Sequence, residues 1–365
     1  MIFKLKSQLA KLLGHSALTS FQLAGAAWVA LLAARGFSMV EIGLAESAFH
    51  IASLLFEIPS GVLSDAFGRK RSLELGRLTG MASSLLMAFS DGLPGVCLAM
   101  VFCAFSYNFD SGAREALAYD SLKAHGREEE YLRYSSLEMA VYRVSHAGAA
   151  LLAGLALAMG HRLAYLLDAA LNLICLFVAL TLDEVMIGPV CCENKGAQRI
   201  ASCVRETAHF LLTQAAARRL MLLNAFAGAA ATLLSFFLQA RLALAGLEHA
   251  YLGPALFVMG LGGAVGSRLA LRLAGMRYGR LYALCLGGIL AGLLLGAGHA
   301  PAAMVAGGFA ANVFDDLLQV RTDSLLNEQF PSSQRATLVS VSSLCFSLVM
   351  IGLSPLAGGF FAMLP

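Results

Sequence analysis

The sequence contains few charged residues. Only 13% of its 365 residues are Asp, Glu, Lys or Arg, whereas 58% are hydrophobic. Soluble domains carry about a quarter charged residues, so this composition excludes an ordinary soluble globular protein. The small net charge of +3 gives no sign of a nucleic-acid partner, and we expect none.

Aromatic residues are also scarce, at 9% of the chain, and Asn-Gly turns are few. A lipid-facing β-barrel needs aromatic girdles and frequent turns, so this scarcity argues against one. Helices satisfy their own backbone hydrogen bonds and are the other structure that crosses lipid. We therefore predict an all-α polytopic membrane protein that has the lipid bilayer as its surroundings.

Motifs of soluble enzymes and ATP-driven pumps are missing. The chain has no GxxxxGK[ST] phosphate loop and no HExxH zinc motif, and its eight cysteines show no metal-ligand spacing. Most cysteines lie in apolar segments, where we expect them to act as small buried hydrophobes. A disulfide or metal at Cys191-Cys192 is the weaker alternative. We expect no enzyme activity, no metal and no cofactor.

Eleven apolar segments are long enough to cross a bilayer, which takes about 20 residues per helix. They are 16–34, 42–63, 72–90, 94–115, 136–160, 163–182, 220–242, 251–273, 281–298, 302–325 and 337–361. Lys and Arg gather in alternate connections, beginning with the segment before the first span. This alternation follows the positive-inside rule and places the N-terminus inside, in a multi-pass protein of the cytoplasmic (inner) membrane.

The chain divides into two related halves. The residues "DSL" at 120–122, after the fourth span, recur at 323–325 after the tenth, and "LLAG" at 151–154 resembles "PLAG" at 355–358. We predict two pseudo-symmetric helical bundles, 1–182 and 218–365. The second stops before a counterpart of 163–182, so we expect 11 spans of 12, with the twelfth absent through truncation or natively.

A polar insert at 183–217 separates the two halves. It carries an apolar stripe through Ile200, Val204, Leu211 and Leu212. A helix lying on the cytoplasmic membrane surface and a solvated connector are the two alternatives for this cytoplasmic linker.

The stretch "SGVLSDAFGRKRS" at 60–72 interrupts the apolar pattern between the second and third spans. It resembles the signature G-x-L-x-D-x-x-G-R-K of the major facilitator superfamily (MFS). The stretches "FEIPSG" at 56–61 and "SGAREALAYDSL" at 111–122 resemble a bacterial branch of that family. The resemblance implies an MFS fold, in which two bundles enclose a central cavity and rock between inward-open and outward-open states.

Residue types in this stretch fit a conformational latch. A glycine at 61 allows close helix approach, and one at 68 allows the positive φ of a tight turn. The carboxylate of Asp65 is expected near the positive end of the next helix. The resemblance implies a latch that holds the cytoplasmic side closed; an exposed loop with weak ion pairs is the alternative. The candidates are Gly61, Asp65, Gly68, Arg69, Lys70, Arg114 and Asp120.

Within this latch, Arg69 is expected to pair with Asp120 at the end of the fourth span, and Arg114 to join them. The second half has a weaker counterpart, "GSRLALRLAGMRYGR" at 266–280, without an aspartate at the position of Asp65. We therefore expect a latch in the first half only.

Ionisable and polar side chains at membrane depth are costly and mark candidate cavity positions. Asp110 and Arg143 have similar depth at ~1.5 Å rise per residue, so they form either a structural pair or a substrate contact. Glu46, His50 and Asp168 form either a proton-responsive gate or a cavity rim. The full set of cavity candidates is Glu46, His50, Asp110, Arg143, His146, Asp168, Asn172, Asn312, Asp315 and Asp316.

The tenth span carries two consecutive carboxylates, Asp315 and Asp316, which point about 100° apart on a helix. One is expected to face the cavity and the other a neighbouring helix. An under-paired carboxylate here suits proton coupling. His146 is either a proton site or a core histidine, and Asn172 and Asn312 either line the cavity or join helices.

Carboxylates outnumber bases among these membrane-depth groups. We therefore expect a monomeric secondary active transporter of a small-molecule substrate by alternating access, with proton-coupled efflux of a cationic or amphiphilic compound. Proton-symport uptake of a small metabolite is one alternative. A non-transporting receptor or lipid-handling protein on the same fold is the other.

Overall fold

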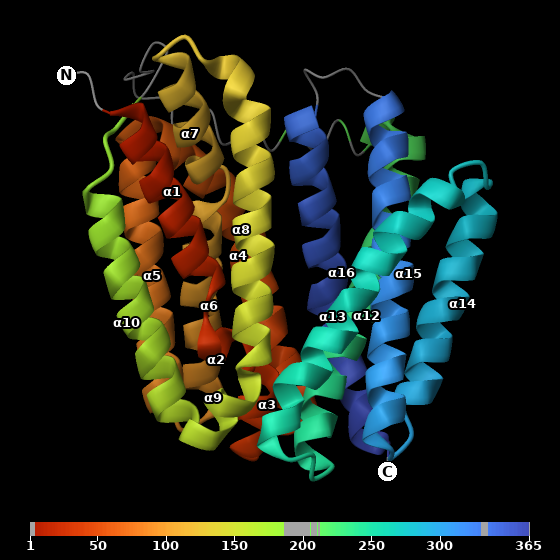
Figure 1. Ribbon diagram of the computed structural model, residues 1–365. Helices are drawn as coiled ribbons and strands as arrows, with labels where there is room; N and C mark the ends of the chain where they lie inside the picture. Colours follow the sequence, from red (N-terminus) through yellow and green to blue (C-terminus); the bar gives the residue numbers. More distant parts are fainter. Residues whose placement is uncertain (1–3, 186–204, 206–209, 211, 330–334, 365) are drawn as a thin grey trace. The chain divides into compact units, whose positions relative to one another are not determined.

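A computed structural model describes residues 4–185, 205, 210, 212–329 and 335–364 of the chain (Figure 1). Within these ranges the elements are helices, and none of the described residues is in a β-strand. The prediction of an all-α protein is confirmed. The predicted surface helix around 200–212 and the Cys191-Cys192 pair lie largely or wholly outside the described residues.

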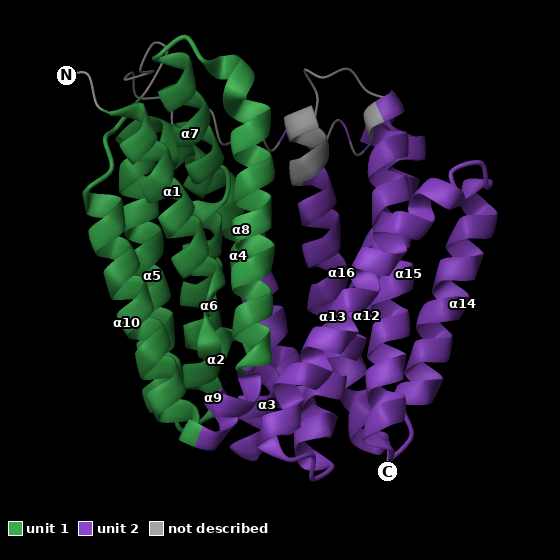
Figure 2. Cartoon of the chain, viewed as in Figure 1, with its two compact units in different colours: residues 1–26, 52–152, 159–204 green, residues 27–51, 153–158, 205–365 purple. Residues whose placement is uncertain are grey.

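Two compact units divide the chain (Figure 2). The first comprises residues 1–26, 52–152 and 159–204, and the second comprises 27–51, 153–158 and 205–365. The units therefore begin and end at other residues than the predicted bundles, because two short pieces of the first half group with the second unit. The helix α4 (Met39–Phe67) contributes residues to both.

Unit 1 is a bundle in which α5 packs against α6 and α10, while α1 packs against α7, α8 and α10 (Figure 1). Apolar side chains such as Leu12, Leu73, Leu117 and Leu122 form a fully buried core between these helices. Its elements are α1 (Leu5–Ser20), α2 (Leu23–Ala26), α5 (Arg69–Phe89), α6 (Leu93–Asp110), α7 (Ala113–Lys123), the 3-10 helix η1 (Glu128–Glu130), α8 (Tyr131–Leu151) and α10 (His161–Leu180).

Unit 2 is built around α15, which packs against α12, α13 and α14, and around α12, which also packs against α3 and α16 (Figure 1). The short helix α9 (Ala153–Met159) lies almost wholly in this unit. Its other helices are α3 (Trp28–Ala34), α12 (Ala215–Leu244), α13 (His249–Arg272), α14 (Tyr278–Gly296), α15 (Pro301–Gln329) and α16 (Arg335–Met363).

Glycines bring α13 and α15 close together in unit 2. A Cβ at Gly262 would collide with the carbonyl oxygen of Phe309, and a Cβ at Gly263 would collide with the carboxylate of Asp316. Small residues at these positions therefore allow close packing of the two helices. In α14, a Cβ at Gly288 would collide with the ring of Phe314, whereas a Cβ at Gly287 would meet nothing within 4 Å.

Seven described helices are long and apolar enough to cross a membrane, and an eighth is added if the pair α8–α9, bent by 44°, counts as one span. The first, third and tenth predicted spans do not pass this test. The helix α1 has only 16 residues, while α5 and α15 carry charged residues along their length. The number of eleven spans therefore stays a prediction.

The first span begins earlier than predicted. We expected it at 16–34, but α1 starts at Leu5, and the segment is interrupted at 21–22 and again at 27. Two polar residues of α1, before the predicted start of the span, have partners in the bundle. Lys11 Nζ donates to the carbonyl oxygen of Thr181 at 2.6 Å, and Gln8 Nε2 donates to that of Asp183 at 2.8 Å.

Candidate functional site

The turn that begins α5 has the conformation its glycine predicted. Gly68 has φ of +104° and precedes the first residue of α5. The anion at this helix end is Glu184, whose Oε1 accepts a hydrogen bond from Arg69 N at 3.1 Å and whose Oε2 accepts one from Lys70 N at 2.9 Å. Asp65, which was expected at this place, belongs to the last turn of α4.

The sequence did not identify Glu184 as a functional residue, because it follows the sixth predicted span by only a few residues. Carboxylates are stabilised at helix N-termini by the free N–H groups and the helix dipole. The sequence does contain a sign of this role, because Glu184 directly follows another acidic residue in "TLDEV" at 181–185. It could not be assigned to α5, because nothing local connects residues 184 and 69.

Of the two arginines expected to pair with Asp120, only Arg69 does so. Arg69 Nη1 forms an ion pair with Asp120 Oδ2, with the two side chains 21% and 9% exposed. Lys70 Nζ donates to the Leu180 carbonyl oxygen at 2.8 Å. Gly61 does not mark a close helix crossing among the described residues, because a Cβ there would meet nothing within 4 Å; that expectation is wrong.

Arg114 does not join Asp120. Its Nε contacts Glu138 Oε1, its Nη1 donates to Asp110 Oδ2 at 3.0 Å, and its Nη2 donates to Glu115 Oε1 at 3.3 Å. The fourth span is interrupted between α6 and α7, where Gly112 has φ of +76°. This interruption turns the arginine at the start of α7 toward the end of α6, and this explains why the prediction failed.

Asp110 is the centre of a buried group of charges. Besides its contact with Arg114, Asp110 has two further partners. Its Oδ1 lies 3.5 Å from Arg77 Nη2 and 3.6 Å from His15 Nε2. Arg77 is 5% exposed and also donates to Asn172 Oδ1 at 3.0 Å and to Ser106 Oγ at 3.2 Å. The predicted pair of Asp110 with Arg143 is therefore wrong.

Arg143 and His146 both lie on exposed parts of α8. His146 stacks on Tyr142 with ring centroids 5.9 Å apart, so the interpretation of a core histidine is also wrong. The direction of Arg143 around the helix axis was therefore not predicted correctly.

Six side chains form the charge network of unit 1, which joins α1, α5, α6, α7 and α8. It contains three carboxylates, two guanidinium groups and one imidazole. Its members are His15, Arg77, Asp110, Arg114, Glu115 and Glu138. His15, Arg77, Glu115 and Glu138 were not predicted from the sequence, although an arginine inside the third apolar segment is by itself a sign of function.

Two polar residues of α10 hold helices together. Asp168, 2% exposed, accepts hydrogen bonds from Leu23 N at 2.6 Å and Gly25 N at 2.9 Å. Asn172 Nδ2 donates to Gln22 Oε1 at 3.1 Å, and its Oδ1 accepts from Arg77. Of the two alternatives for Asn172, the helix-joining one is therefore observed.

In unit 2, Glu46 and His50 form a pair one helical turn apart. Glu46 Oε1 lies 3.2 Å from His50 Nε2, and His50 Nδ1 lies 3.2 Å from Ser347 Oγ on α16. Both residues are buried. Asp168 has its carboxylate on the backbone of α2 and takes no part in this pair, so the predicted group of three is reduced to two.

The consecutive carboxylates of α15 face different helices, whereas one of them was expected to face the cavity. Asp316 Oδ2 lies 3.5 Å from Ser267 Oγ on α13. Asp315 faces α12, where a Cβ at Gly228 would lie 3.4 Å from its Oδ1. Within the described residues, the structure gives Asp315 no hydrogen bond and no ion pair, although its side chain is half-buried.

Asn312, one turn before this pair, joins helices. Its Nδ2 donates to the Met259 carbonyl oxygen at 2.9 Å, and its Oδ1 lies 3.5 Å from Ser235 Oγ.

In the second half, the region that corresponds to the latch is joined by hydrogen bonds and not by an ion pair. Arg321 Nη2 donates to the Ala274 carbonyl oxygen at 2.7 Å, and Tyr278 Oη lies 2.9 Å from Thr322 Oγ1. Asp323, the counterpart of Asp120, accepts from Gln319 at 3.0 Å. In the described part of 266–280 no arginine has a carboxylate partner, in line with a latch in the first half only.

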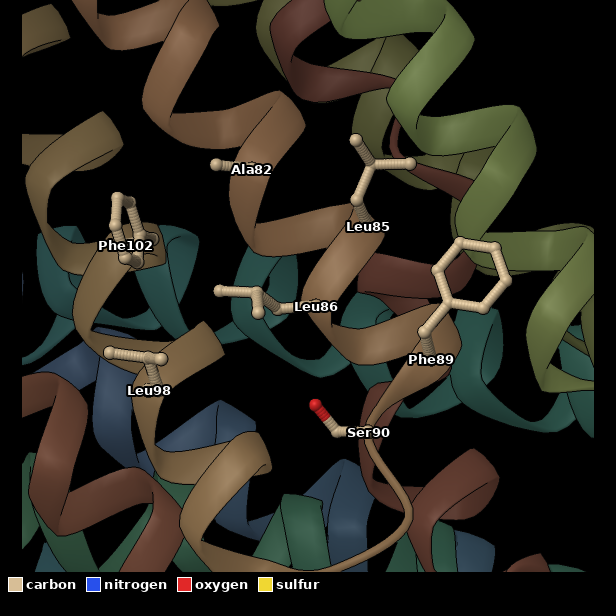
Figure 3. Close-up of a pocket in the computed structure, with 7 residues that line it drawn as sticks. All are labelled: Ala82, Leu85, Leu86, Phe89, Ser90, Leu98 and Phe102. Atoms are coloured by element: carbon tan, nitrogen blue, oxygen red, sulfur yellow. The ribbon is translucent and has the colours of Figure 1, made fainter.

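Two hollows lie on the surface of unit 1. The larger, about 530 Å³, is an apolar groove between α5 and α6 in which Ser90 is the one polar lining residue (Figure 3). None of the predicted candidates lines it. The smaller, about 440 Å³, surrounds the start of α5 and is lined by Phe67, Lys70, Arg71 and Glu184 among others.

Comparisons with known proteins agree with the resemblance in the sequence. A sequence model of the Major Facilitator Superfamily matches residues 12–297. YxaM of Bacillus subtilis (strain 168), an uncharacterized MFS-type transporter, is 32% identical over 88 residues, or 24% of this chain and 22% of YxaM. The aligned part thus spans about a fifth of that relative.

Solved transporter structures share the fold. The nucleoside transporter NupG superposes with a TM-score of 0.72 at 16% identity, over 98% of this chain and 91% of NupG. A D-xylose-proton symporter superposes with a TM-score of 0.64 at 13% identity, over 98% of this chain and 88% of the symporter. At these identities the likeness shows the fold alone.

Proposed function

Because the chain belongs to the major facilitator superfamily, we propose that this MFS transporter exports a cationic or amphiphilic compound in exchange for protons. Transporters of this kind rock two bundles about a substrate site and so expose it to each side in turn. We propose that the protein works as a monomer in the cytoplasmic membrane, with its N-terminus inside.

Asp315 carries this proposal. It is a half-buried carboxylate on α15, the helix of the tenth predicted span, and the described residues offer it neither a cation nor a hydrogen-bond donor. A carboxylate at this depth is costly unless it is paired, and a substrate with a positive charge supplies the missing partner. Neighbouring Asp316 contacts Ser267, so Asp315 is the better placed of the two to meet a cation.

The ion pair between Arg69 and Asp120 supports the conformational part of the proposal. It joins the start of α5 to α7 at the side that the positive-inside rule assigns to the cytoplasm. Forming the pair in one state and breaking it in the other would bias the two states by ~1–3 kcal/mol. Arg69 and Asp120 are therefore proposed as the latch, with Gly68 and Lys70 shaping its turn.

Transport into proteoliposomes tests the proposal, with ethidium as the cationic probe and an imposed pH gradient. The wild type is expected to accumulate ethidium against its gradient when the lumen is acidic. Asp315→Asn is expected to reduce this to the level of empty liposomes, because the neutral amide offers the cation no charge. Asp91→Asn, at a residue whose side chain is 91% exposed, is the matched control and keeps full activity.

Other probes distinguish the alternatives. Accumulation of uridine or D-xylose along the proton gradient, without ethidium movement, would establish symport uptake and overturn export of cations. A folded protein that moves none of the three probes, and whose unfolding temperature responds to none of them, would fit a non-transporting member of the family.

A further inference from the structure

The charge network of unit 1 has one carboxylate more than it has guanidinium groups. Asp110, Glu115 and Glu138 stand against Arg77 and Arg114, and all five are joined by contacts of 3.5 Å or less. An uncompensated charge in a buried site is expensive, and burial favours the neutral form of an acid. The network therefore has room for one proton.

The three carboxylates differ in how well they are compensated. Asp110 has both arginines and His15 around it. Glu115 has a side chain that is 41% exposed, and its Oε1 accepts a hydrogen bond from Arg114 Nη2 at 3.3 Å. Glu138 has a side chain that is only 8% exposed, and its one cation is Arg114, which it shares with the other two.

The remaining groups around Glu138 add no positive charge. On α7, Arg114 and Glu115 face it, and Asp110 faces it from the end of α6. On its own helix, Tyr131 and Tyr134 lie close enough to interact electrostatically with Glu138, and neither carries a positive charge.

The other elements that pack against α8 offer no further cation. On α1, His15 lies against Asp110 on the far side of the network, and α2 carries no titratable residue. In η1, Glu130 already pairs with Arg127. Glu138 is thus the buried carboxylate with the least compensation in the network.

We propose that Glu138 is the proton-binding residue of this transporter. A proton taken from water forms an O–H bond on the Glu138 carboxylate, which loses its charge, and release of the proton to water restores the charge. When Glu138 is neutral, Arg114 is held by Asp110 and Glu115 alone, so protonation loosens the tie between α7 and α8. The inference rests on the proposed proton-coupled function.

Infrared difference spectroscopy on the protein in lipid bilayers tests the site without any substrate. A protonated carboxyl group has a carbonyl-stretch band that a carboxylate lacks. We expect the wild type to have such a band from Glu138 that disappears as the pH is raised. It should be absent in Glu138→Gln and retained, at a shifted frequency, in Glu138→Asp. Glu46→Gln, at a buried carboxylate of unit 2, is the matched control and keeps the band.

Glu115→Gln adds a readout that a structural role would not affect. This variant removes one carboxylate at the exposed end of the network and leaves two carboxylates against two guanidiniums. We expect the Glu138 band to be weaker than in the wild type at the same pH, because the excess negative charge is gone. A Glu138→Gln spectrum that loses none of the titrating carboxyl bands of the wild type, or a wild type with no such band, would overturn the proposal.

Transport separates the failure of this proposal from that of the function. With ethidium as probe, Glu138→Gln is expected to lose accumulation driven by a pH gradient and to retain exchange of ethidium across the membrane at equal concentrations. A variant that still accumulates ethidium in response to the gradient overturns the role of Glu138. A wild type that moves no probe contradicts the proposed function, while the infrared result still decides whether Glu138 binds the proton.

Discussion

Asp168 on α10 accepts hydrogen bonds from the backbone N–H groups of Leu23 and Gly25, at 2.6 and 2.9 Å. These N–H groups belong to α2, the short helix that resumes the first span after the interruption at 21–22. The first N–H groups of a helix have no partner within it. Asp168 supplies that partner from a segment about 145 positions away along the chain.

Replacing Asp168 by Ala should destabilise unit 1. The N–H groups of Leu23 and Gly25 would lose their acceptor in a buried place, and an unsatisfied buried donor costs about 1–3 kcal/mol. Asp168→Asn keeps one carbonyl oxygen and should lose less. Thermal unfolding in detergent would show the order wild type, Asn, Ala, with Asp91→Asn as the exposed control. Equal unfolding temperatures for all four would contradict the capping role.

The break in the first span could not be predicted from the sequence, since residues 16–34 form one continuous apolar segment. The break is stabilised by Asp168, which accepts hydrogen bonds from the N–H groups it leaves free. Asp168 is far away in the chain. The helical class, the glycine turn at 68 and the pair Arg69–Asp120 could be predicted, because composition and a specific motif carry them.

Side-chain direction was the main source of error in the candidate site. Depth counted from the end of a span places Asp110 and Arg143 at one height, but height does not fix the direction around the helix axis. The break at Gly112 turns α7, and so Arg114 reaches Asp110 instead of Asp120. Glu138, near the start of the predicted span 136–160, was not among the candidates, because its burial depends on the neighbouring helices.

Two glycines of α13 should respond to alanine in opposite ways. A Cβ at Gly266 would collide with the carbonyl oxygen of Val313 on α15, whereas a Cβ at Gly260 would meet nothing within 4 Å. Gly266→Ala should therefore force α13 and α15 apart and lower the unfolding temperature. Gly260→Ala should leave stability unchanged or raise it by up to about 1 kcal/mol, because alanine favours the helix. A loss of stability in Gly260→Ala as large as in Gly266→Ala would contradict the packing argument.

Glu184 should stabilise the start of α5 by its charge. Glu184→Gln keeps one oxygen that can accept a hydrogen bond but removes the negative charge from the helix N-terminus. The loss of this charge should lower the stability by about 0.3–1 kcal/mol at an exposed position. Hydrogen–deuterium exchange should become faster at Arg69 and Lys70, whose N–H groups point at the carboxylate. The difference should shrink in high salt, since salt screens exposed charges. Exchange rates that do not change in the variant would show that the backbone contacts need no charge.

The ion pair between Arg69 and Asp120 should have a measurable coupling energy, unlike an exposed pair nearby. Single variants Arg69→Gln and Asp120→Asn and the double variant form a thermodynamic cycle, in which contacting residues typically give about 0.5–3 kcal/mol. The matched control is Arg127 with Glu130, whose side chains are 44% and 37% exposed. The control cycle should give a value near zero, because water screens exposed pairs. Thermal unfolding of both sets in the same detergent gives the two energies. If the two cycles give the same small value, the pair at α5 is a surface contact and the latch must rest on other residues.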